Sequence, residues 1–271
     1  MEGMEGQRRL KQFDLCSGIG AGYCFAGAAL GLQLVGVAEI DDYCCGILAK
    51  RYPGVENFGD IAKLESLPEA DIISCSTPCP PFSIRGMRLG ADDERDCFPF
   101  VVKIVERVRP KYCVIENVPG LLNCPLRPGA KELYINRLAE IFDTLGYRLE
   151  GALVSGGSVG SRFVRQRLLL VAVANSIQFS EIPSPWIEQI RAALETNRTL
   201  GAGTSNKPSI LRGIARNSNR LDRPNQLSYS LGLPKGDRII RRRREALGNT
   251  FDPRLAAIGL HRVLYLESIS R

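Results

Sequence analysis

The chain contains few of the residues that build hydrolytic and metal sites. Histidine occurs once, as His261. A Ser-His-Asp triad or a metal site with several histidine ligands is therefore not expected, and we expect His261 to be a surface or packing residue of a C-terminal helix. The nine cysteines form no Cys-x-x-Cys pair and are odd in number. These features argue against a zinc ribbon and a disulfide framework, and they predict reduced thiols in an intracellular, reducing compartment.

Long apolar runs are also missing. No segment is apolar over the length needed to span a membrane, and residues 1–12 form a charged leader without the features of a signal peptide. We expect this leader to be disordered and the protein to have no membrane partner.

Strand-like and helix-like segments alternate through the first two thirds of the chain. This alternation continues to Ala174 and predicts an α/β fold with a mostly parallel sheet and helices on both faces. The length of 271 residues suits one such domain with a small insertion.

The most informative stretch is Thr77-Pro78-Cys79-Pro80-Pro81-Phe82-Ser83, where prolines surround a cysteine. Proline fixes its own φ and restricts the preceding residue, so this loop has few conformations. It follows an apolar run over residues 70–75 that predicts a buried strand. Cys79 is thus expected at the carboxyl end of a strand, where open α/β sheets bind ligands. The plainer interpretation is a stiffened loop with a buried thiol.

A second candidate site lies nearer the N-terminus. A predicted strand over residues 13–17 leads into Gly18-Ile19-Gly20-Ala21-Gly22 and then into an Ala-rich segment typical of a helix. Glycines at such a junction let the backbone approach a ligand at the helix N-terminus. The next predicted strand, residues 33–38, ends in Glu39, where nucleotide-binding folds place a carboxylate for ribose. A plain tight turn and an N-cap carboxylate are the alternatives.

Charged residues border two later strands. The apolar run 111–115 ends in Glu116, and Arg165 and Arg167 precede the run 168–173. Such charges are most often solvated. Beside a reactive cysteine, however, a carboxylate can exchange a proton with a bound ring, and planar guanidinium groups can hold its polar atoms.

Together these motifs resemble the DNA (cytosine-5) methyltransferase family. The resemblance rests on five ordered segments: Asp-Leu-x-Ser-Gly-Ile-Gly from Asp14, Pro-Cys-x-Pro-Phe-Ser around Cys79, Glu-Asn-Val from Glu116, Arg-x-Arg from Arg165, and Gly-Asn-x-x-x-Pro around Asn249. It covers about residues 11–173 and 225–266. It implies a Rossmann-like, class I S-adenosylmethionine methyltransferase fold with a small target-recognition insertion.

The resemblance also implies a role for each motif. Cys79 would attack carbon 6 of a flipped cytosine, Glu116 would hydrogen-bond ring nitrogen 3 and the exocyclic amine, and Arg165, with Arg167 beside it, would hold the carbonyl oxygen. Such an attack makes carbon 5 nucleophilic enough to take a methyl group. The implied methyl donor is S-adenosyl-L-methionine, with these contacts: Asp14, Cys16, Gly18, Ile19, Gly20, Glu39, Ile40, Asp60, Ile61, Pro78 and Asn249.

The chain departs from the family pattern at three positions. Cys16 stands where the family commonly has a phenylalanine against the adenine, which predicts weaker cofactor binding. Pro80 replaces a common glutamine, which stiffens the loop and removes a backbone donor. Phe163 occupies the glutamine position of the Gln-x-Arg-x-Arg motif.

Positive charge is concentrated in one part of the chain. The whole chain has a net charge of +7, whereas residues 191–245 alone have 13 basic and 4 acidic residues, so the rest is net negative. This excess predicts a nucleic-acid partner, with Arg241 and Arg242 as phosphate contacts, and the family resemblance implies that the partner is double-stranded DNA. A solvated basic face is the alternative. The loop 83–92 contains two glycines and predicts a lid over the flipped base, with Ser83, Arg85 and Arg88 near the DNA.

The predicted division of the chain follows from these segments. We expect a catalytic and cofactor-binding domain over 13–174, a basic target-recognition region over 175–245, and a segment over 246–271 that packs back on the first domain. Within the second part we expect an amphipathic helix from Trp186 and a mobile loop over 199–208. So short a region predicts few base-edge contacts, and therefore a short target, weak specificity or a partner protein that supplies it. We expect a monomer.

Three other functions compete with this one. An RNA (tRNA) cytosine-5 methyltransferase would use the same cysteine, glutamate and arginine. A non-catalytic DNA-binding regulatory subunit is expected to have lost the nucleophile or the carboxylate, and both are present here. A nucleotide-binding oxidoreductase would leave the cysteine and arginines unexplained. The expected location is a bacterial cytoplasm or nucleoid, or its phage or archaeal equivalent.

Overall fold

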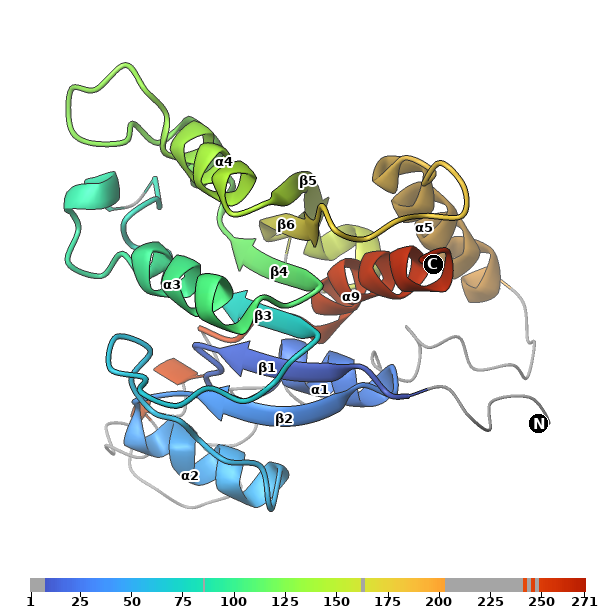
Figure 1. Cartoon of the computed structure of the whole chain (residues 1–271), viewed down its shortest axis with the longest axis horizontal. Coiled ribbons are helices and arrows are strands. Elements are labelled where there is room, and N and C mark those ends of the chain that lie inside the picture. Colours follow the sequence, from blue (N-terminus) through green and yellow to red (C-terminus); the bar gives the residue numbers. More distant parts are fainter. Residues whose placement is uncertain (1–7, 85, 162–163, 203–240, 243–244, 247–248) are drawn as a thin grey trace.

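The computed structural model describes residues 8–84, 86–161, 164–202, 241–242, 245–246 and 249–271. Within this part, six strands form one sheet in the order β2-β1-β3-β4-β6-β5 (Figure 1). Their bounds are Lys11–Leu15 for β1, Gln33–Ala38 for β2, Ile72–Ser76 for β3, Tyr112–Asn117 for β4, Tyr147–Ser155 for β5 and Gln166–Ala174 for β6. The mostly parallel α/β sheet predicted from the alternating pattern is confirmed.

One strand departs from the parallel arrangement. β1 to β4 are mutually parallel, whereas β6 runs antiparallel to both of its neighbours. Glu116, near the end of β4, therefore pairs with Leu169, near the start of β6. The alternation of apolar runs did not reveal this reversal, which brings the first residues of β6 to the edge where β3 and β4 end.

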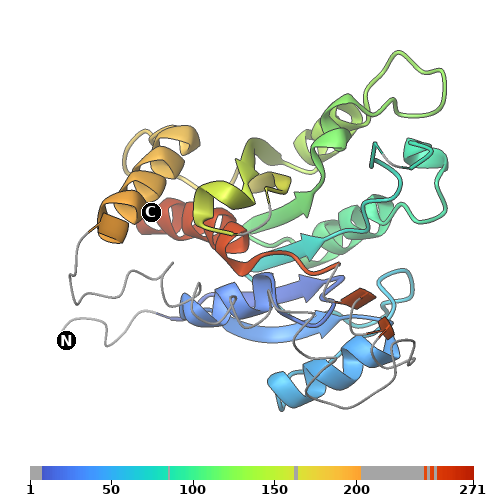
Figure 2. The same ribbon diagram turned by 180° about the vertical axis from the view of Figure 1, so that it is seen from behind.

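Helices cover both faces of the sheet (Figures 1 and 2). α1 (Tyr23–Ala29) and α9 (Pro253–Ser268) pack on one face with α5 (Trp186–Ala202) beside α9, and α3 (Phe98–Val108) and α4 (Tyr134–Thr144) pack on the other. α2 (Asp42–Arg51) lies next to β2. The described residues also form the short 3-10 helices η1 (Gly90–Asp92), η2 (Pro119–Asn123) and η3 (Gly156–Val159).

The central strand β4 is apolar without alternation because the sheet is covered on both faces at this strand. Every residue of β4 is buried. Tyr112 and Val114 point to the cluster made with α1 and α9, and Cys113 and Ile115 point to the cluster made with α3 and α4. A strand covered on both faces needs apolar residues at both sets of alternate positions.

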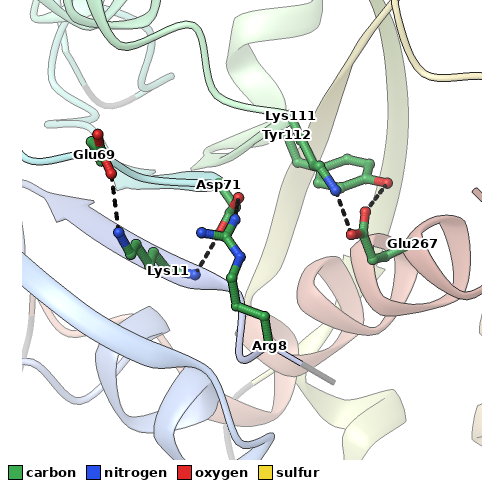
Figure 3. Close-up of polar contacts among 7 residues, drawn as sticks. All are labelled: Arg8, Lys11, Glu69, Asp71, Lys111, Tyr112 and Glu267. Carbon is green, nitrogen blue, oxygen red and sulfur yellow. Dashed lines mark hydrogen bonds and ion pairs between the residues drawn. The ribbon is translucent and has the colours of Figure 1, made fainter. Parts of the chain in front are cut away.

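The C-terminal helix α9 is bound closely to the sheet. A Cβ at Gly259 would lie 2.8 Å from a methyl carbon of Val114, so the absence of a side chain allows this close approach. Near its C-terminus, Glu267 accepts hydrogen bonds from Lys111 Nζ at 2.6 Å and from Tyr112 Oη at 3.0 Å (Figure 3). The half-buried His261 also lies on this helix, and burial lowers its pKa.

Three expectations about segment boundaries can be compared with the structure. The leader was expected to reach residue 12, but β1 begins at Lys11 and Gln12 is fully buried, because its side chain bonds to Tyr23 and Ser74 inside the sheet layer. The helix predicted from Trp186 is confirmed, and it continues to Ala202. The loop predicted over 199–208 therefore does not start at residue 199, because residues 199–202 belong to this helix. Its remainder lies outside the described residues, and the division into three parts stays a prediction.

The described residues also bear on membranes and metals. None of their helices combines the length and apolarity needed to cross a membrane. In the same part of the chain, no group of three or more His, Cys, Asp and Glu side chains is arranged to hold a metal ion.

Candidate active site

Cys79 lies in a tight turn three residues beyond β3. The N–H groups of Phe82 and Ser83 donate to the Cys79 carbonyl oxygen at 3.1 and 2.9 Å. The fully buried Phe82 ring packs against Phe98 and Tyr134, with centroid distances of 5.6 and 4.7 Å. The turn is thus anchored by an aromatic cluster as well as by its prolines, and the sequence analysis did not identify these anchors.

Two contacts fix the turn that contains Cys79 to the end of β4. Asn117 Nδ2 donates to Thr77 Oγ1 at 2.7 Å, in a buried position. A Cβ at Gly120 would lie 2.2 Å from the Phe82 carbonyl oxygen, so only glycine allows the two backbones to come so close. These contacts set the position of Cys79 relative to Glu116.

Glu116 and Arg167 form a buried ion pair at the same edge of the sheet. Arg167 Nε lies 2.5 Å from Glu116 Oε1, and both side chains are about one-tenth exposed. The antiparallel direction of β6 makes this pair possible. Burial raises the pKa of Glu116 to about 7, against the opposing effect of the positive charges of Arg167 and Arg165. Near neutral pH this carboxyl group can therefore hold and donate a proton.

The glycine turn after β1 is held by the carboxylate of Glu39. Gly18 and Gly20 have φ values of +54° and +68°, which glycine adopts readily. The Glu39 carboxylate accepts hydrogen bonds from Gly18 N–H at 2.6 Å and from the N–H groups of Ile40 and Asp41 at 2.9 Å each. The residue proposed for ribose binding thus also joins the end of β2 to the turn.

Asn57, which was not predicted as a site residue, supports Glu39 from the loop that also contains Asp60 and Ile61. Its Oδ1 accepts from Glu39 N–H, and its Nδ2 donates to the Glu39 carbonyl oxygen, both at 3.0 Å. Asn57 itself belongs to none of the motifs, so no signal in the sequence pointed to this role.

Asp14 lies beneath the glycine turn as a buried carboxyl group. It accepts hydrogen bonds from Ser74 Oγ at 2.5 Å and from Cys24 Sγ at 3.0 Å. Burial raises the pKa of Asp14 to about 6, although these hydrogen bonds act in the opposite direction. Its bonding partners make it a structural support for the turn as well as a wall of the site.

Cys16 and Cys97 form a thiol-lined part of the site. Cys16 has a φ of +53°, and its thiol exchanges hydrogen bonds with Cys75 and Cys97. The hydrogen bond with Cys75, together with burial, raises the pKa of Cys16. The pKa of Cys97 is also raised, so the thiols of Cys16 and Cys97 stay protonated at neutral pH.

A single cavity of about 760 Å³ joins the two predicted sites. All four predicted catalytic residues line it: Cys79, Glu116, Arg165 and Arg167. So do ten of the eleven predicted cofactor contacts, namely Asp14, Cys16, Gly18, Ile19, Glu39, Ile40, Asp60, Ile61, Pro78 and Asn249. Gly20 does not; its carbonyl oxygen accepts a hydrogen bond from Tyr52 Oη at 2.6 Å. Cys97, Phe100, Thr250 and Phe251 also line the cavity and were not predicted.

The predicted nucleic-acid contacts are more scattered. Ser83, Arg88 and Arg241 do not line the cavity, whereas Arg242 does. The Arg88 guanidinium donates to the backbone and side-chain oxygens of Asn123 at 2.6 Å each, so it braces η2. Arg85 lies outside the described residues.

Sequence comparison identifies relatives of this chain. It is 34% identical over 185 residues to the type II methyltransferase M.NgoMIV of Neisseria gonorrhoeae, an alignment that covers 65% of this chain and 56% of that protein. It is 33% identical over 175 residues to the orphan methyltransferase M.SPRI of Bacillus phage SPR, with coverage of 62% and 39%. The chain thus spans about half the length, or less, of these relatives.

The fold matches solved methyltransferase structures. The S. pombe Dnmt2 methyltransferase superposes with a TM-score of 0.57 at 16% identity, covering 96% of this chain and 99% of that one. The Entamoeba histolytica methyltransferase EhMeth gives a TM-score of 0.57 at 14% identity, with coverage of 97% and 99%. The architecture is therefore that of the class I methyltransferases.

The family itself follows from the sequence. The model of the C-5 cytosine-specific DNA methylase family matches residues 10–246. This chain belongs to that family, and the resemblance drawn from its five motifs is confirmed.

Proposed function

We propose that this chain transfers a methyl group from S-adenosyl-L-methionine to carbon 5 of a cytosine in double-stranded DNA. The observation that carries this proposal is that Cys79, Glu116 and Arg167 line the same cavity as Glu39 and the glycine turn. A nucleophile, a proton donor and a nucleoside-binding end therefore share one space, as a transfer between two bound molecules requires.

The residues at the nucleoside end fit the proposed cofactor. A cavity of about 760 Å³ is within the range of small-molecule sites. Glu39 closes one side with carboxylate oxygens suited to ribose hydroxyls, and Asp60 offers an acceptor for an adenine amine. Ile61, Cys97 and Phe100 supply apolar and aromatic surface for a flat ring. When bound there, the cofactor would supply an electrophilic methyl group.

The protein's own residues account for the activation of cytosine. The Cys79 thiolate adds to carbon 6 and forms a carbon–sulfur bond, which makes carbon 5 nucleophilic. Glu116 gives its proton to ring nitrogen 3 as this bond forms, and its raised pKa keeps that proton available near neutral pH. Arg165 binds the ring's carbonyl oxygen, and Arg167 holds the Glu116 carboxyl group in place. After methylation, the carbon 5 proton passes to solvent water and the carbon–sulfur bond breaks, which releases Cys79 as a thiolate. Ring nitrogen 3 then returns its proton to Glu116, so that the product is neutral 5-methylcytosine.

Transfer of labelled methyl groups tests the proposal. The purified chain should methylate duplex DNA, and Cys79→Ser should lose this activity while it still binds the cofactor. Cys113→Ser is the control, because Cys113 lies in the core on β4 and does not line the cavity. Transfer RNA should be tested in parallel. Methylation of RNA alone would replace DNA as the substrate, and normal turnover by Cys79→Ser would disprove the mechanism.

A further inference from the structure

We infer that Arg242 and Asp41 form a clasp that retains the cofactor, so that Arg242 is a positioning residue for the methyl donor rather than a contact to DNA phosphate. This inference rests on the proposed function, because it assigns a role at the cofactor end of the same cavity.

The clasp joins two segments far apart in the sequence. Arg242 Nη2 lies 3.0 Å from Asp41 Oδ2, and both residues line the cavity. Their side chains are 36% and 43% exposed, which places the pair where the cavity meets solvent. The Asp41 N–H also donates to the Glu39 carboxylate, so the pair lies next to the nucleoside end of the cavity.

Asp41 is held ready for this contact by the start of α2. Its Oδ1 accepts a hydrogen bond from Cys44 N–H at 3.0 Å as the N-cap of the helix, while Oδ2 faces Arg242. Its own N–H donates to the Glu39 carboxylate. The hydrogen bond from Cys44 is the main reason that the pKa of Asp41 is lowered, and Arg242 adds to this effect. The carboxylate is therefore charged and fixed in direction next to the proposed ribose contact.

Packing on the C-terminal side of Arg242 keeps its segment against the cavity. Ala246 packs against the cluster of Ile19 and Cys44, which joins the glycine turn to α2. Farther along, the Phe251 ring lies 5.1 Å from the Tyr23 ring, at the start of α1. These described residues are thus anchored to the walls of the cavity, and Arg242 adds an ion pair with Asp41, the N-cap of α2.

The neighbouring Arg241 differs in each of these respects. It pairs with Glu245 at 2.9 Å within its own segment, its side chain is 79% exposed, and it does not line the cavity. Of the two arginines, Arg241 is therefore the one exposed enough to contact a DNA phosphate. It provides a matched control for Arg242.

The test measures cofactor and DNA binding separately in four variants of the full chain. They are Arg242→Gln, Asp41→Asn, the double variant and Arg241→Gln. Asparagine caps helices about as well as aspartate, so Asp41→Asn removes the charge and keeps the α2 cap. The readouts are the dissociation constant for S-adenosyl-L-methionine by calorimetry, the salt dependence of DNA binding, and KM and kcat for the cofactor.

We expect each clasp variant to bind the cofactor about threefold to fivefold more weakly, as for the loss of one partly exposed ion pair. The double variant should be no weaker than either single variant, because both changes break the same contact. KM for the cofactor should rise with kcat unchanged. Arg242→Gln should leave the salt dependence of DNA binding unaltered, whereas Arg241→Gln should reduce it.

Several results would overturn the clasp. Unchanged cofactor affinity in Arg242→Gln, additive losses in the double variant, or a reduced salt dependence in Arg242→Gln would each contradict it. Failure of the wild-type chain to bind S-adenosyl-L-methionine would instead contradict the proposed function, so the two failures are distinguishable.

Discussion

Ion pairs lie at both ends of the parallel strands, which we call the amino edge and the carboxyl edge of the sheet, but their roles differ. At the amino edge, where β1, β3 and β4 begin, Arg8 pairs with Asp71 and Lys111 pairs with Glu267 (Figure 3). At the carboxyl edge, where these strands end, Glu116 pairs with Arg167 beside a cavity. Pairs at the amino edge join elements of the fold, whereas burial at the carboxyl edge shifts the pKa of a carboxyl group toward neutrality. Opposite charges alone therefore do not mark a reactive site; burial and an adjoining cavity do.

The largest difference between the edges should appear when one glutamate is neutralised at each. Glu116→Gln keeps the shape of the side chain but cannot transfer a proton, so we expect kcat to fall by about 10²- to 10⁴-fold. Glu267→Gln, the matched change at the amino edge, should leave kcat unaltered. Methyl transfer at saturating cofactor and DNA measures both. A kcat of Glu116→Gln within a few-fold of the wild-type value would contradict the proposed catalytic role of the carboxyl edge.

The carboxyl edge should also be sensitive to backbone position. Gly120→Ala places a Cβ against the Phe82 carbonyl oxygen and so displaces the turn that contains Cys79. Because a shift of about 1 Å can cost about 100-fold in rate, we expect kcat to fall by that order with cofactor binding preserved. Gly46→Ala is the control, since a Cβ there meets nothing within 4 Å and alanine favours the helix. Unchanged kcat in Gly120→Ala would show that the turn is not held by this contact.

The pH dependence of the reaction should reflect Glu116. Its pKa is raised from 4.5 to about 7, so the carboxyl group is protonated below neutrality and loses its proton above it. Because the protonated form donates to the ring, kcat/KM for DNA should fall by about tenfold per pH unit above about pH 7. The profile of residual Glu116→Gln activity should lack this decline. A wild-type profile that stays level to about pH 9 would mean that the ionised form is active.

The smallest effect should come from the amino edge, and it should concern stability alone. Lys111→Ala removes one partner of Glu267, and we expect it to lower the free energy of unfolding by about 1 kcal/mol. The melting temperature should then drop by about 2–4 °C, with cofactor and DNA binding unchanged. Arg137→Ala, which breaks the exposed pair with Glu140 on α4, should change stability by less. A loss of activity in Lys111→Ala at a temperature where it is folded would contradict the division between the edges.

The sequence predicted the two edges to different extents. The alternating pattern and the motifs around Gly18, Cys79 and Glu116 predicted the sheet and the main walls of the cavity, because strand ends in a parallel sheet converge on one edge. The reversal of β6 was not predicted, since apolar content does not encode strand direction. The supports from Asn57, Phe82 and Gly120 were also missed, because they depend on contacts between residues distant in the chain.

The predicted DNA contacts show a second limit. Charge composition marks a basic segment, but it does not say which arginine faces which partner. Arg88 donates to Asn123 and Arg242 pairs with Asp41, and both contacts require the folded chain. Ser83, Arg85, Arg88 and Arg241 remain predictions as DNA contacts, and for Arg242 the proposed clasp is the alternative.

The most direct test of the account is to trap the bond between Cys79 and cytosine. Duplex DNA that contains 5-fluorocytosine should form a stable covalent adduct with the chain in the presence of S-adenosyl-L-methionine, because fluorine cannot leave carbon 5 as a proton does. Proteolysis and mass spectrometry should place the modified nucleotide on the peptide that contains Cys79, with no adduct from Cys79→Ser. An adduct on another cysteine, or equal trapping by Cys79→Ser, would contradict the central assignment.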